Sequence, residues 1–388
     1  MKVAVLKETL AGECRVGLIP DMVSKLIGPN VEIRIQSAAG ERAYFSDHQY
    51  QEKGAVIENS FVETLDGADI ILKVQPPSLE EAKLLPAGSA IVSFMQPAYC
   101  PDIVDDMAKR QITVFSLDLL PRISRAQSMD ALSSQATVAG YAAILTAAQK
   151  LPKFFPMFMT AAGTVPPAKV LVMGTGVAGL QAIATARRLG AVVNAYDVRS
   201  AASQEVASLG ANFIKLELET QEGEGGYARE QTQEFLDQQR ELIASYVKLS
   251  DVVVTTAMIP GKPAPVLVTR QMVETMQRGS VIVDLAASAG GNCEITVADT
   301  EVFHNGVQIL GPTNLPSSMP LHASFLYSKN ITNFILPMIK EGDLEFDFED
   351  EIMKSTCITH NGEILHKPTL ELLEKTKSEK TKSEGSNL

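Results

Sequence analysis

Short runs rich in β-branched residues alternate with helical patterns over most of the chain, and this alternation restricts the fold more than any other feature. Strands that alternate with helices are typical of repeated βα units around a parallel sheet. A second series of such units begins at Lys169. The sequence therefore predicts an α/β chain with two Rossmann-like domains. The runs interpreted as strands are Val3–Leu6, Val31–Ile35, Ile70–Val74, Ala90–Phe94 and Val114–Ser116, followed by Val170–Met173, Val192–Tyr196, Asn212–Lys215, Val252–Thr255, Val281–Leu285 and Val307–Leu310.

Two long helical patterns set the expected domain organisation. Residues 133–150 are interpreted as the helix that carries the chain from one domain into the other, and residues 321–338 as a helix that packs back onto the first domain. No third sheet is expected after Leu310. These patterns predict a discontinuous first domain, 1–132 plus 320–372, and a second domain, 133–319. Residues 373–388 repeat a short polar unit and are predicted to be a disordered tail.

Charge and composition exclude several classes of function. The formal net charge of −12 argues against nucleic acid and anionic lipid as partners, because a surface of that sign repels phosphate groups. The four cysteines form no CxxC pair and have no histidine at metal-ligand spacing, so we expect no metal site and no disulfides. The most apolar stretch, 136–151, is shorter than the roughly 20 residues of a membrane helix. A soluble cytoplasmic protein without direct membrane insertion is expected.

A glycine-rich turn, Gly174-Thr-Gly-Val-Ala-Gly179, indicates a nucleotide site. A lone GxGxxG is weak evidence, but this one follows a predicted strand directly and opens a helical pattern at 180–189. Gly174 can make the sharp turn, and Gly176 can admit a pyrophosphate against the helix N-terminus, with Val177 in the same turn. Gly179 then allows close packing of helix and strand.

An acid at the end of the next predicted strand indicates which dinucleotide binds. Asp197 lies about 20 residues past the turn, where a carboxylate accepts hydrogen bonds from the ribose 2′-hydroxyl and repels a 2′-phosphate. Arg199 leaves another interpretation open, because a nearby arginine can accept that phosphate. We expect NAD(H), bound once per chain with Asp197, Val198 and Arg199 in the site. The alternative is a structural glycine turn followed by a surface aspartate.

Four segments resemble one known family. Residues 121–135, PRISRAQSMDALSSQ, closely resemble a loop in the NAD(H)-binding domain of the proton-translocating nicotinamide nucleotide transhydrogenase. Residues 160–169, 225–228 and 255–265 resemble the same family, and the resemblance covers nearly all of the chain except its polar tail. It implies the alpha subunit of a Re/Si-specific NAD(P)+ transhydrogenase, in which hydride passes directly between NAD(H) here and NADP(H) on a partner subunit.

The resemblance also implies partners and a location. The NADP(H)-binding beta subunit and a membrane-embedded subunit would couple hydride exchange to proton translocation. This chain would then be attached peripherally to the cytoplasmic side of a membrane through those subunits. The family forms a homodimer, for which the apolar segment Phe154–Met159 could supply an interface strand. An interior strand is the alternative for this segment.

The resemblance assigns roles to four polar residues of the loop. Arg122 and Asp130 would form an ion pair beside the nicotinamide, Gln127 would reach toward the partner's nucleotide, and Ser133 would hold the carboxamide. None of them serves as an acid or base, because hydride transfer between two nicotinamides requires only that the reacting carbons be correctly placed. Without the resemblance, Arg122 and Asp130 would be interpreted as a solvated surface pair.

Three further residues match segments of the family that lie near the nucleotide. Gly226 and Tyr227 resemble a mobile loop that closes over the bound dinucleotide and excludes water. Met258 matches an apolar segment beside it. Composition alone allows a surface loop without a role for the first two residues and a plain strand exit for Met258.

Two other functions remain open. The chain also resembles alanine dehydrogenase, and Arg15 and Lys73 match pyruvate-binding positions there. However, the places of its catalytic histidine and aspartate are taken by Gln96 and Ser288, and an amino-acid dehydrogenase needs a proton-transfer group beside the substrate carbon. Arg15 and Lys73 are then structural residues. A non-catalytic NAD-sensing module is the third possibility.

Overall fold

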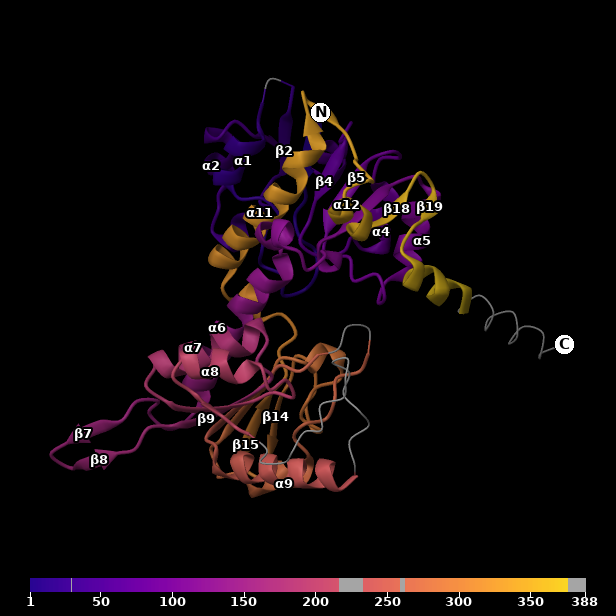
Figure 1. The fold of residues 1–388 in the computed structure, drawn as a ribbon. Helices are drawn as coiled ribbons and strands as arrows, with labels where there is room; N and C mark the ends of the chain where they lie inside the picture. Colours follow the sequence, from indigo (N-terminus) through magenta and orange to yellow (C-terminus); the bar gives the residue numbers. More distant parts are fainter. Residues whose placement is uncertain (29, 216–232, 259–261, 376–388) are drawn as a thin grey trace. The chain divides into compact units, whose positions relative to one another are not determined.

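The chain folds as two compact units. The computed structural model describes residues 1–28, 30–215, 233–258 and 262–375. Unit 1 comprises Met1–Gln135 and Pro316–Leu388, and unit 2 comprises Ala136–Leu315 (Figure 1). The prediction of a two-domain α/β chain whose first domain is discontinuous is confirmed.

The predicted tail begins too early. Residues 373–375 are helical, and Leu373 is buried among other residues of unit 1, because its leucine side chain interrupts the polar repeat. The remainder of the predicted tail, 376–388, lies outside the described residues.

Unit 1 contains an eight-stranded sheet in the order β19-β18-β6-β5-β4-β1-β2-β3. The six strands from β6 to β3 are parallel, whereas β18 runs antiparallel to β6 and β19 antiparallel to β18. The central strands have apolar residues on both faces, as strands covered by helices on both sides require. The strands are β1 (Lys2–Val5), β2 (Glu32–Gln36), β3 (Val56–Glu58), β4 (Ile70–Leu72), β5 (Ala90–Ser93), β6 (Thr113–Ser116), β18 (Cys357–His360) and β19 (Glu363–Ile364).

The helix predicted at 321–338 covers one face of this sheet. It is α11, Pro320–Ile335, and a short 3₁₀ turn, η6 (Leu336–Met338), follows where Pro337 interrupts the α-helix. Tyr327 and Phe334 of α11 are fully buried and contact Phe94 and Phe115 of the sheet, with ring centroids 5.3 and 5.7 Å apart. The other helices of this unit are α1 (Pro20–Leu26), α2 (Asp47–Glu52), α3 (Phe61–Leu65), α4 (Leu79–Leu84), α5 (Pro101–Lys109) and α12 (Glu351–Thr356), with 3₁₀ turns η1 (Glu41–Ala43), η2 (Leu117–Leu119) and η3 (Ser124–Met129).

The expectation that no further sheet follows Leu310 was wrong. Strands β16 (Ile339–Lys340) and β17 (Asp343–Leu344) form a two-stranded sheet. Gly342, with a φ of +95°, supplies the left-handed residue that so tight a turn needs. Two residues per strand are too few to produce an alternating pattern in the sequence.

Unit 2 contains a seven-stranded sheet in the order β11-β10-β9-β12-β13-β15-β14, parallel except for the last strand. The chain passes from β9 outward to β10 and β11, then returns to β12 on the other side of β9. The direction of winding therefore reverses beside β9, which is where open α/β sheets bind ligands. The strands are β9 (Lys169–Met173), β10 (Val192–Tyr196), β11 (Asn212–Phe213), β12 (Val252–Thr255), β13 (Val281–Asp284), β14 (Glu301–His304) and β15 (Val307–Leu310).

The helix predicted at 133–150 is α6 (Ala131–Lys150), which begins in unit 1 and ends in unit 2. Among the described residues, no helix combines the length and apolar character needed to cross a membrane. The remaining helices of unit 2 are α7 (Val177–Arg188), α8 (Ala202–Ser208), α9 (Gln233–Leu249) and α10 (Arg270–Thr275), with the 3₁₀ turn η4 (Ala287–Ala289), while η5 (Leu315–Ser318) lies at the unit boundary.

The segment Phe154–Met159 is not an interior strand. It leads into a hairpin of β7 (Phe158–Thr160) and β8 (Gly163–Val165), whose six residues are all exposed. Figure 1 shows the hairpin extending away from the sheet of its own unit. The interior alternative is therefore wrong, because both faces of so short a hairpin remain uncovered.

Candidate functional site

The glycine turn of unit 2 is held in one conformation by contacts that tolerate no side chain. The Gly174 amide donates to the Tyr196 carbonyl at 2.8 Å, and its φ of +97° is a left-handed conformation. A Cβ at Gly174 would lie 2.4 Å from Thr256 Oγ1, and one at Gly179 would lie 1.9 Å from the Gly174 carbonyl oxygen. These glycines therefore fix how closely β9, α7 and the end of β12 pack.

Gly176 differs from its two neighbours in the motif. It is the N-cap of α7, no side chain caps the helix there, and a Cβ at this position would meet no atom within 4 Å. The first amides of a 12-residue helix therefore lack a side-chain acceptor beside open space. Such a terminus favours an anion, since its amides and the helix dipole both attract negative charge. The residues present thus fit the pyrophosphate of a dinucleotide.

Asp197 lies at the carboxyl end of β10 and is tied to the same turn. Its Oδ2 accepts from the Thr175 amide and hydroxyl, both at 2.7 Å, and its Oδ1 accepts from the Arg199 amide at 2.9 Å and Nε at 3.0 Å. Burial opposes its ionisation, but the hydrogen bonds from Arg199 and Thr175 outweigh burial and hold the pKa of Asp197 well below its ordinary value. Asp197 is therefore a carboxylate at neutral pH.

The pair formed by Asp197 and Arg199 bears on cofactor choice. The Arg199 side chain is largely exposed, while that of Asp197 is mostly buried. A ribose hydroxyl that donates to Asp197 must share its oxygens with these protein donors, and a 2′-phosphate would meet the carboxylate as well as the guanidinium. Val198 between them is exposed.

The end of β12 supplies the opposite side of the turn. Thr256 Oγ1 donates to the Gly174 carbonyl at 3.1 Å, which joins the two strand ends. Buried Asn292 accepts from the Ala257 amide at 2.9 Å and donates to the Ala257 carbonyl at 2.8 Å. Met258, the next residue, is exposed. Sequence reasoning missed Thr256 and Asn292, although the glycine pair just before Asn292 signalled a turn.

Asp284 at the end of β13 is fully buried and fully engaged. Its oxygens accept from the Asn292 and Cys293 amides at 2.7 and 2.9 Å and from the Thr255 and Thr296 hydroxyls at 2.9 and 2.7 Å. A carboxylate held by so many donors fixes the loop that presents Asn292. Its role is to support the site rather than to exchange protons.

The structure brings most of the predicted nucleotide residues to one edge of one sheet. The carboxyl ends of β9, β10 and β12 are neighbours, and Gly174, Asp197 and Met258 follow them directly. Exposed Val177 and Val198 lie at the same edge and give it apolar surface. Gly226 and Tyr227 lie outside the described residues.

The polar loop predicted from 121–135 lies in unit 1 and carries its functional candidates outward. It contains the 3₁₀ turn η3, in which Ala126 and Met129 are buried in the hydrophobic core. Between them Gln127 is exposed, and so is Arg122 before them. The two buried anchors therefore direct Gln127 to the surface.

Asp130 does not form the expected ion pair with Arg122. It precedes the first residue of α6, where its Oδ1 accepts from the Ser133 amide at 2.9 Å and its Oδ2 from the Ser133 hydroxyl at 2.5 Å. Within the described residues no salt bridge joins it to Arg122. The N-cap position explains this outcome, because the carboxylate satisfies an otherwise unpaired helix amide and lies near the positive end of the helix dipole.

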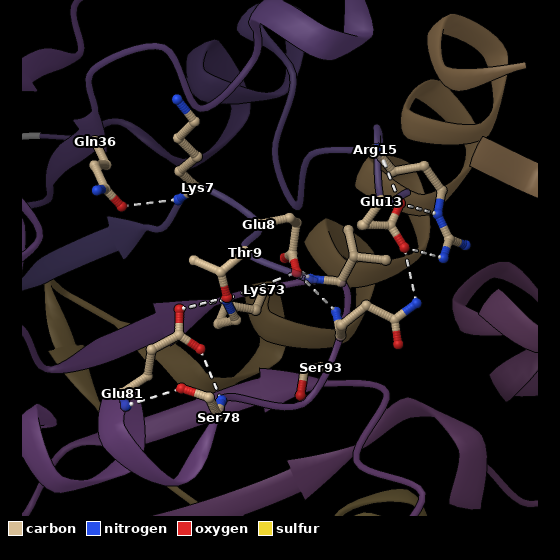
Figure 2. Close-up of polar contacts among 12 residues, drawn as sticks. Lys7, Glu8, Thr9, Glu13, Arg15, Gln36, Lys73, Ser78, Glu81 and Ser93 are labelled. Atoms are coloured by element: carbon tan, nitrogen blue, oxygen red, sulfur yellow. Dashed lines mark hydrogen bonds and ion pairs between the residues drawn. The ribbon is translucent and has the colours of Figure 1, made fainter. Parts of the chain in front are cut away.

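Arg15 and Lys73 belong to a buried network in unit 1 (Figure 2). Arg15 forms a two-pronged pair with Glu13, with Nε to Oε1 at 2.8 Å and Nη2 to Oε2 at 2.7 Å. Lys73 Nζ lies 3.3 Å from Glu81 and 3.7 Å from Glu8. Both cations are almost inaccessible to solvent, as the interpretation of structural residues requires.

The two inner carboxyl groups of this network titrate in opposite directions. Burial raises the pKa of Glu8 to about 7, although Lys73 and the amide of Val74 lower it to some extent. Burial acts on Glu13 in the same sense, but its hydrogen bonds and ion pair with Arg15 dominate and lower its pKa to about 2. Glu13 and Arg15 therefore form the strongly ionised portion of the network.

The positions that carry proton transfer in an amino-acid dehydrogenase hold no acid or base here. Gln96 is exposed, with a φ of +45°, and Ser288 lies exposed in η4. Among the histidines, His304 pairs with Glu274, His360 contacts Phe348, and His366 bonds to Thr369. None of these three contacts involves the glycine turn or the polar loop.

Two family models match most of the chain. The model described as "Alanine dehydrogenase/PNT, N-terminal domain" matches residues 4–139, and "Alanine dehydrogenase/PNT, C-terminal domain" matches residues 143–367.

Curated relatives match over nearly the full chain. An NAD(P) transhydrogenase subunit alpha protein of Rhodospirillum rubrum is 45% identical over 376 residues, which cover 94% of this chain and 98% of that protein. The protein of the same name from Rickettsia prowazekii is 42% identical and covers 94% of this chain and 96% of its own length. Alanine dehydrogenase of Halomonas elongata is 27% identical and covers 96% of both chains.

Solved structures agree with these relatives. The transhydrogenase from Sinorhizobium meliloti superimposes with a TM-score of 0.86 at 42% identity and covers 94% of this chain and 100% of that chain. An L-alanine dehydrogenase superimposes with a TM-score of 0.81 at 22% identity, covering 97% and 99%, and so shares the fold.

Proposed function

Since this chain belongs to the alanine dehydrogenase/PNT family, and within it to the NAD(P) transhydrogenase alpha subunits, we propose that it exchanges hydride with NADP(H) held by a partner beta subunit. NAD(H) is bound by the glycine turn of unit 2, and the reaction is that of a Re/Si-specific NAD(P)+ transhydrogenase. A membrane-embedded subunit couples the exchange to proton translocation. The observation that carries the proposal is the uncapped N-terminus of α7 beside open space at Gly176.

The residues of unit 2 bind and orient the dinucleotide. The α7 amides and Gly176 hold the pyrophosphate, and Asp197 accepts from the ribose, exchanging some of its bonding with Thr175 and Arg199. Exposed Val177, Val198 and Met258 supply apolar contacts. Gly226 and Tyr227 close over the site and exclude water.

The loop of unit 1 arranges the transfer itself. The bound dinucleotides supply the hydride chemistry, so the protein needs to set distance and orientation. Ser133, whose hydroxyl donates to Asp130, accepts from the carboxamide of the nicotinamide. Gln127, exposed between two buried neighbours, contacts the partner's nucleotide. Arg122 and Asp130 pair only in the assembled complex, which requires Asp130 to share its carboxylate between the helix cap and Arg122.

Assembly completes the proposal. The predicted domains, 1–132 plus 320–372 and 133–319, serve as loop carrier and nucleotide carrier. Two copies associate through the exposed hairpin β7–β8, where Phe158 and Met159 present apolar surface to water. The chain attaches to the cytoplasmic side of a membrane only through its partner subunits.

Alanine dehydrogenase activity is the alternative that the fold allows. Gln96 and Ser288 offer no group that could donate or accept a proton at neutral pH, so the substrate carbon would lack its acid or base. A second alternative, an NAD-sensing module without turnover, shares the nucleotide site but requires no exposed Gln127.

Partner dependence separates these functions. The purified chain should bind NADH more tightly than NADPH and should transfer no hydride alone. Adding the NADP(H)-binding subunit should start transhydrogenation, followed as reduction of an NADP+ analogue with a shifted absorbance. Turnover with pyruvate and ammonium by the chain alone would establish the first alternative, and NADH binding without transfer in the presence of the partner would favour the second.

A further inference from the structure

The loop that carries Gln127 is held from outside by a helix of the C-terminal segment. The carbonyl of Ser128, the next residue, accepts from Asn330 Nδ2 at 3.0 Å and from Asn333 Nδ2 at 3.1 Å. Both asparagines belong to α11, more than 200 residues away in the sequence. One carbonyl of an exposed turn therefore has two side-chain donors from a buried helix.

Asn330 also connects the loop to the start of α6. Its Oδ1 accepts from the Ser134 hydroxyl at 2.7 Å, and the Ser134 amide donates to the Asp130 carbonyl at 3.2 Å. Asn330 is only 8% exposed, so both ends of its amide are used inside the protein. A single buried amide thus sets the spacing between Ser128 and the first turn of α6.

Within the loop itself, few hydrogen bonds fix the backbone. The Ala126 amide donates to Ile123 at 3.0 Å and the Asp130 amide to Gln127 at 3.3 Å. The Arg125 pair with Asp350, at 2.6 Å for both nitrogens, adds a surface contact of small energy, because Arg125 is exposed. The α11 amides therefore determine where the peptide after Gln127 lies.

We propose that Asn330 and Asn333 are positioning residues for Gln127. They hold the Ser128 carbonyl so that the Gln127 side chain leaves the loop in the orientation that hydride transfer needs. The inference deepens the function proposed above and rests on it, since it assigns Gln127 a contact with the partner's nucleotide. Misplacement of a reacting group by about 1 Å costs on the order of a hundredfold in rate.

Isosteric variants test this role. Asn330→Asp keeps the acceptor for Ser134 but replaces the donor to Ser128 with a like-charged oxygen, and Asn333→Ala removes the second donor at a half-buried position. Asn30→Asp is the matched control, because Asn30 Nδ2 donates to a carbonyl of unit 1, that of Glu341, at 3.0 Å. Each variant is measured for single-turnover hydride transfer with the NADP(H)-binding subunit, for NADH affinity and for stability to urea.

We expect Asn330→Asp to slow hydride transfer at least about tenfold and Asn333→Ala to slow it less, with NADH affinity within about twofold of wild type. The control should match wild type in rate. In a double-mutant cycle with Gln127→Asn, the rate losses of Asn330→Asp should be much less than additive, since both changes act through one side chain. General loosening of unit 1 would instead give additive losses.

Three results would overturn the inference: an unchanged rate in both variants, equal losses of rate and NADH affinity, or additive losses in the cycle. If Asn330→Asp does not fold, Asn333→Ala and its own cycle with Gln127→Asn decide the matter alone. A wild-type chain that transfers no hydride with the partner overturns the proposed function together with the inference. An active wild type with active variants overturns the inference alone.

Discussion

Replacing Glu13 by glutamine removes the negative charge from the centre of the buried network of unit 1. Glu13 is fully buried and accepts from Arg15 through both oxygens, from Ser317 Oγ at 2.5 Å and from Gln75 Nε2 at 2.8 Å. Glu13→Gln keeps the shape of the side chain but leaves the Arg15 guanidinium buried without a balancing charge.

The pKa of Glu13 gives the size of the effect. It falls from an ordinary 4.5 to about 2 in the folded chain, because the bonds from Arg15 outweigh the opposing effect of burial. This difference corresponds to about 3 kcal/mol of folded-state stability, at about 1.4 kcal/mol for each pH unit. Because the folded pKa is depressed, the stabilisation is present above pH 4.5 and is lost as pH falls toward 2. Breaking one partner of a buried pair costs about 3–5 kcal/mol by an independent route.

Urea unfolding followed by far-UV circular dichroism measures this change. Glu13→Gln should lower the unfolding free energy of unit 1 by about 3 kcal/mol at pH 7, and the difference from wild type should shrink as pH drops below 4.5. Glu345→Gln is the control, since its pair with Lys340 is exposed on both sides and contributes under about 1 kcal/mol. The reasoning is refuted if Glu13→Gln is as stable as this control.

Further predictions concern the two candidate sites. Gly179→Ala should lower both stability and NADH affinity, because its Cβ would lie 1.9 Å from the Gly174 carbonyl oxygen, whereas Gly176→Ala should fold normally and lose NADH affinity alone, since its Cβ enters open space; calorimetric melting and NADH titration compare them, and normal NADH binding by Gly176→Ala would contradict the site. Asp197→Ala should weaken NADH binding about tenfold or more, as for a lost charge-assisted hydrogen bond, and unchanged affinity in a titration would remove it from the ribose. Gln127→Asn should slow single-turnover transfer far more than it weakens NADH binding, and equal losses would count against its placement role.

The sequence predicts the centre of each sheet because those strands are fully buried. Runs such as 70–74 and 252–255 are apolar on both faces, so their pattern does not depend on distant neighbours. Strand β18 was missed because it pairs antiparallel with β6 from about the far end of the chain. Its residues, 357–360, alternate too briefly to stand out, and only the tertiary contact makes them a strand.

The candidate site was predictable where a backbone conformation demands glycine and unpredictable where acceptors compete. Gly174 and Gly179 are required by contacts within one βα turn, so their spacing alone identifies them. Asp130 could have paired with Arg122 or capped α6, and the structure chooses the cap. The link made by Thr256 joins strand ends 82 residues apart, for which no local signal exists.

Direct transfer of a labelled hydride tests the central claim. NADH deuterated at the transferred position of nicotinamide C4 is mixed with the chain, the NADP(H)-binding subunit and NADP+, and the NADPH formed is examined by mass spectrometry. We predict that NADPH carries one deuterium from NADH, that water contributes none, and that nothing forms without the partner. NADPH without the label, or oxidation of labelled NADH by the chain alone with a small metabolite, would contradict direct transfer.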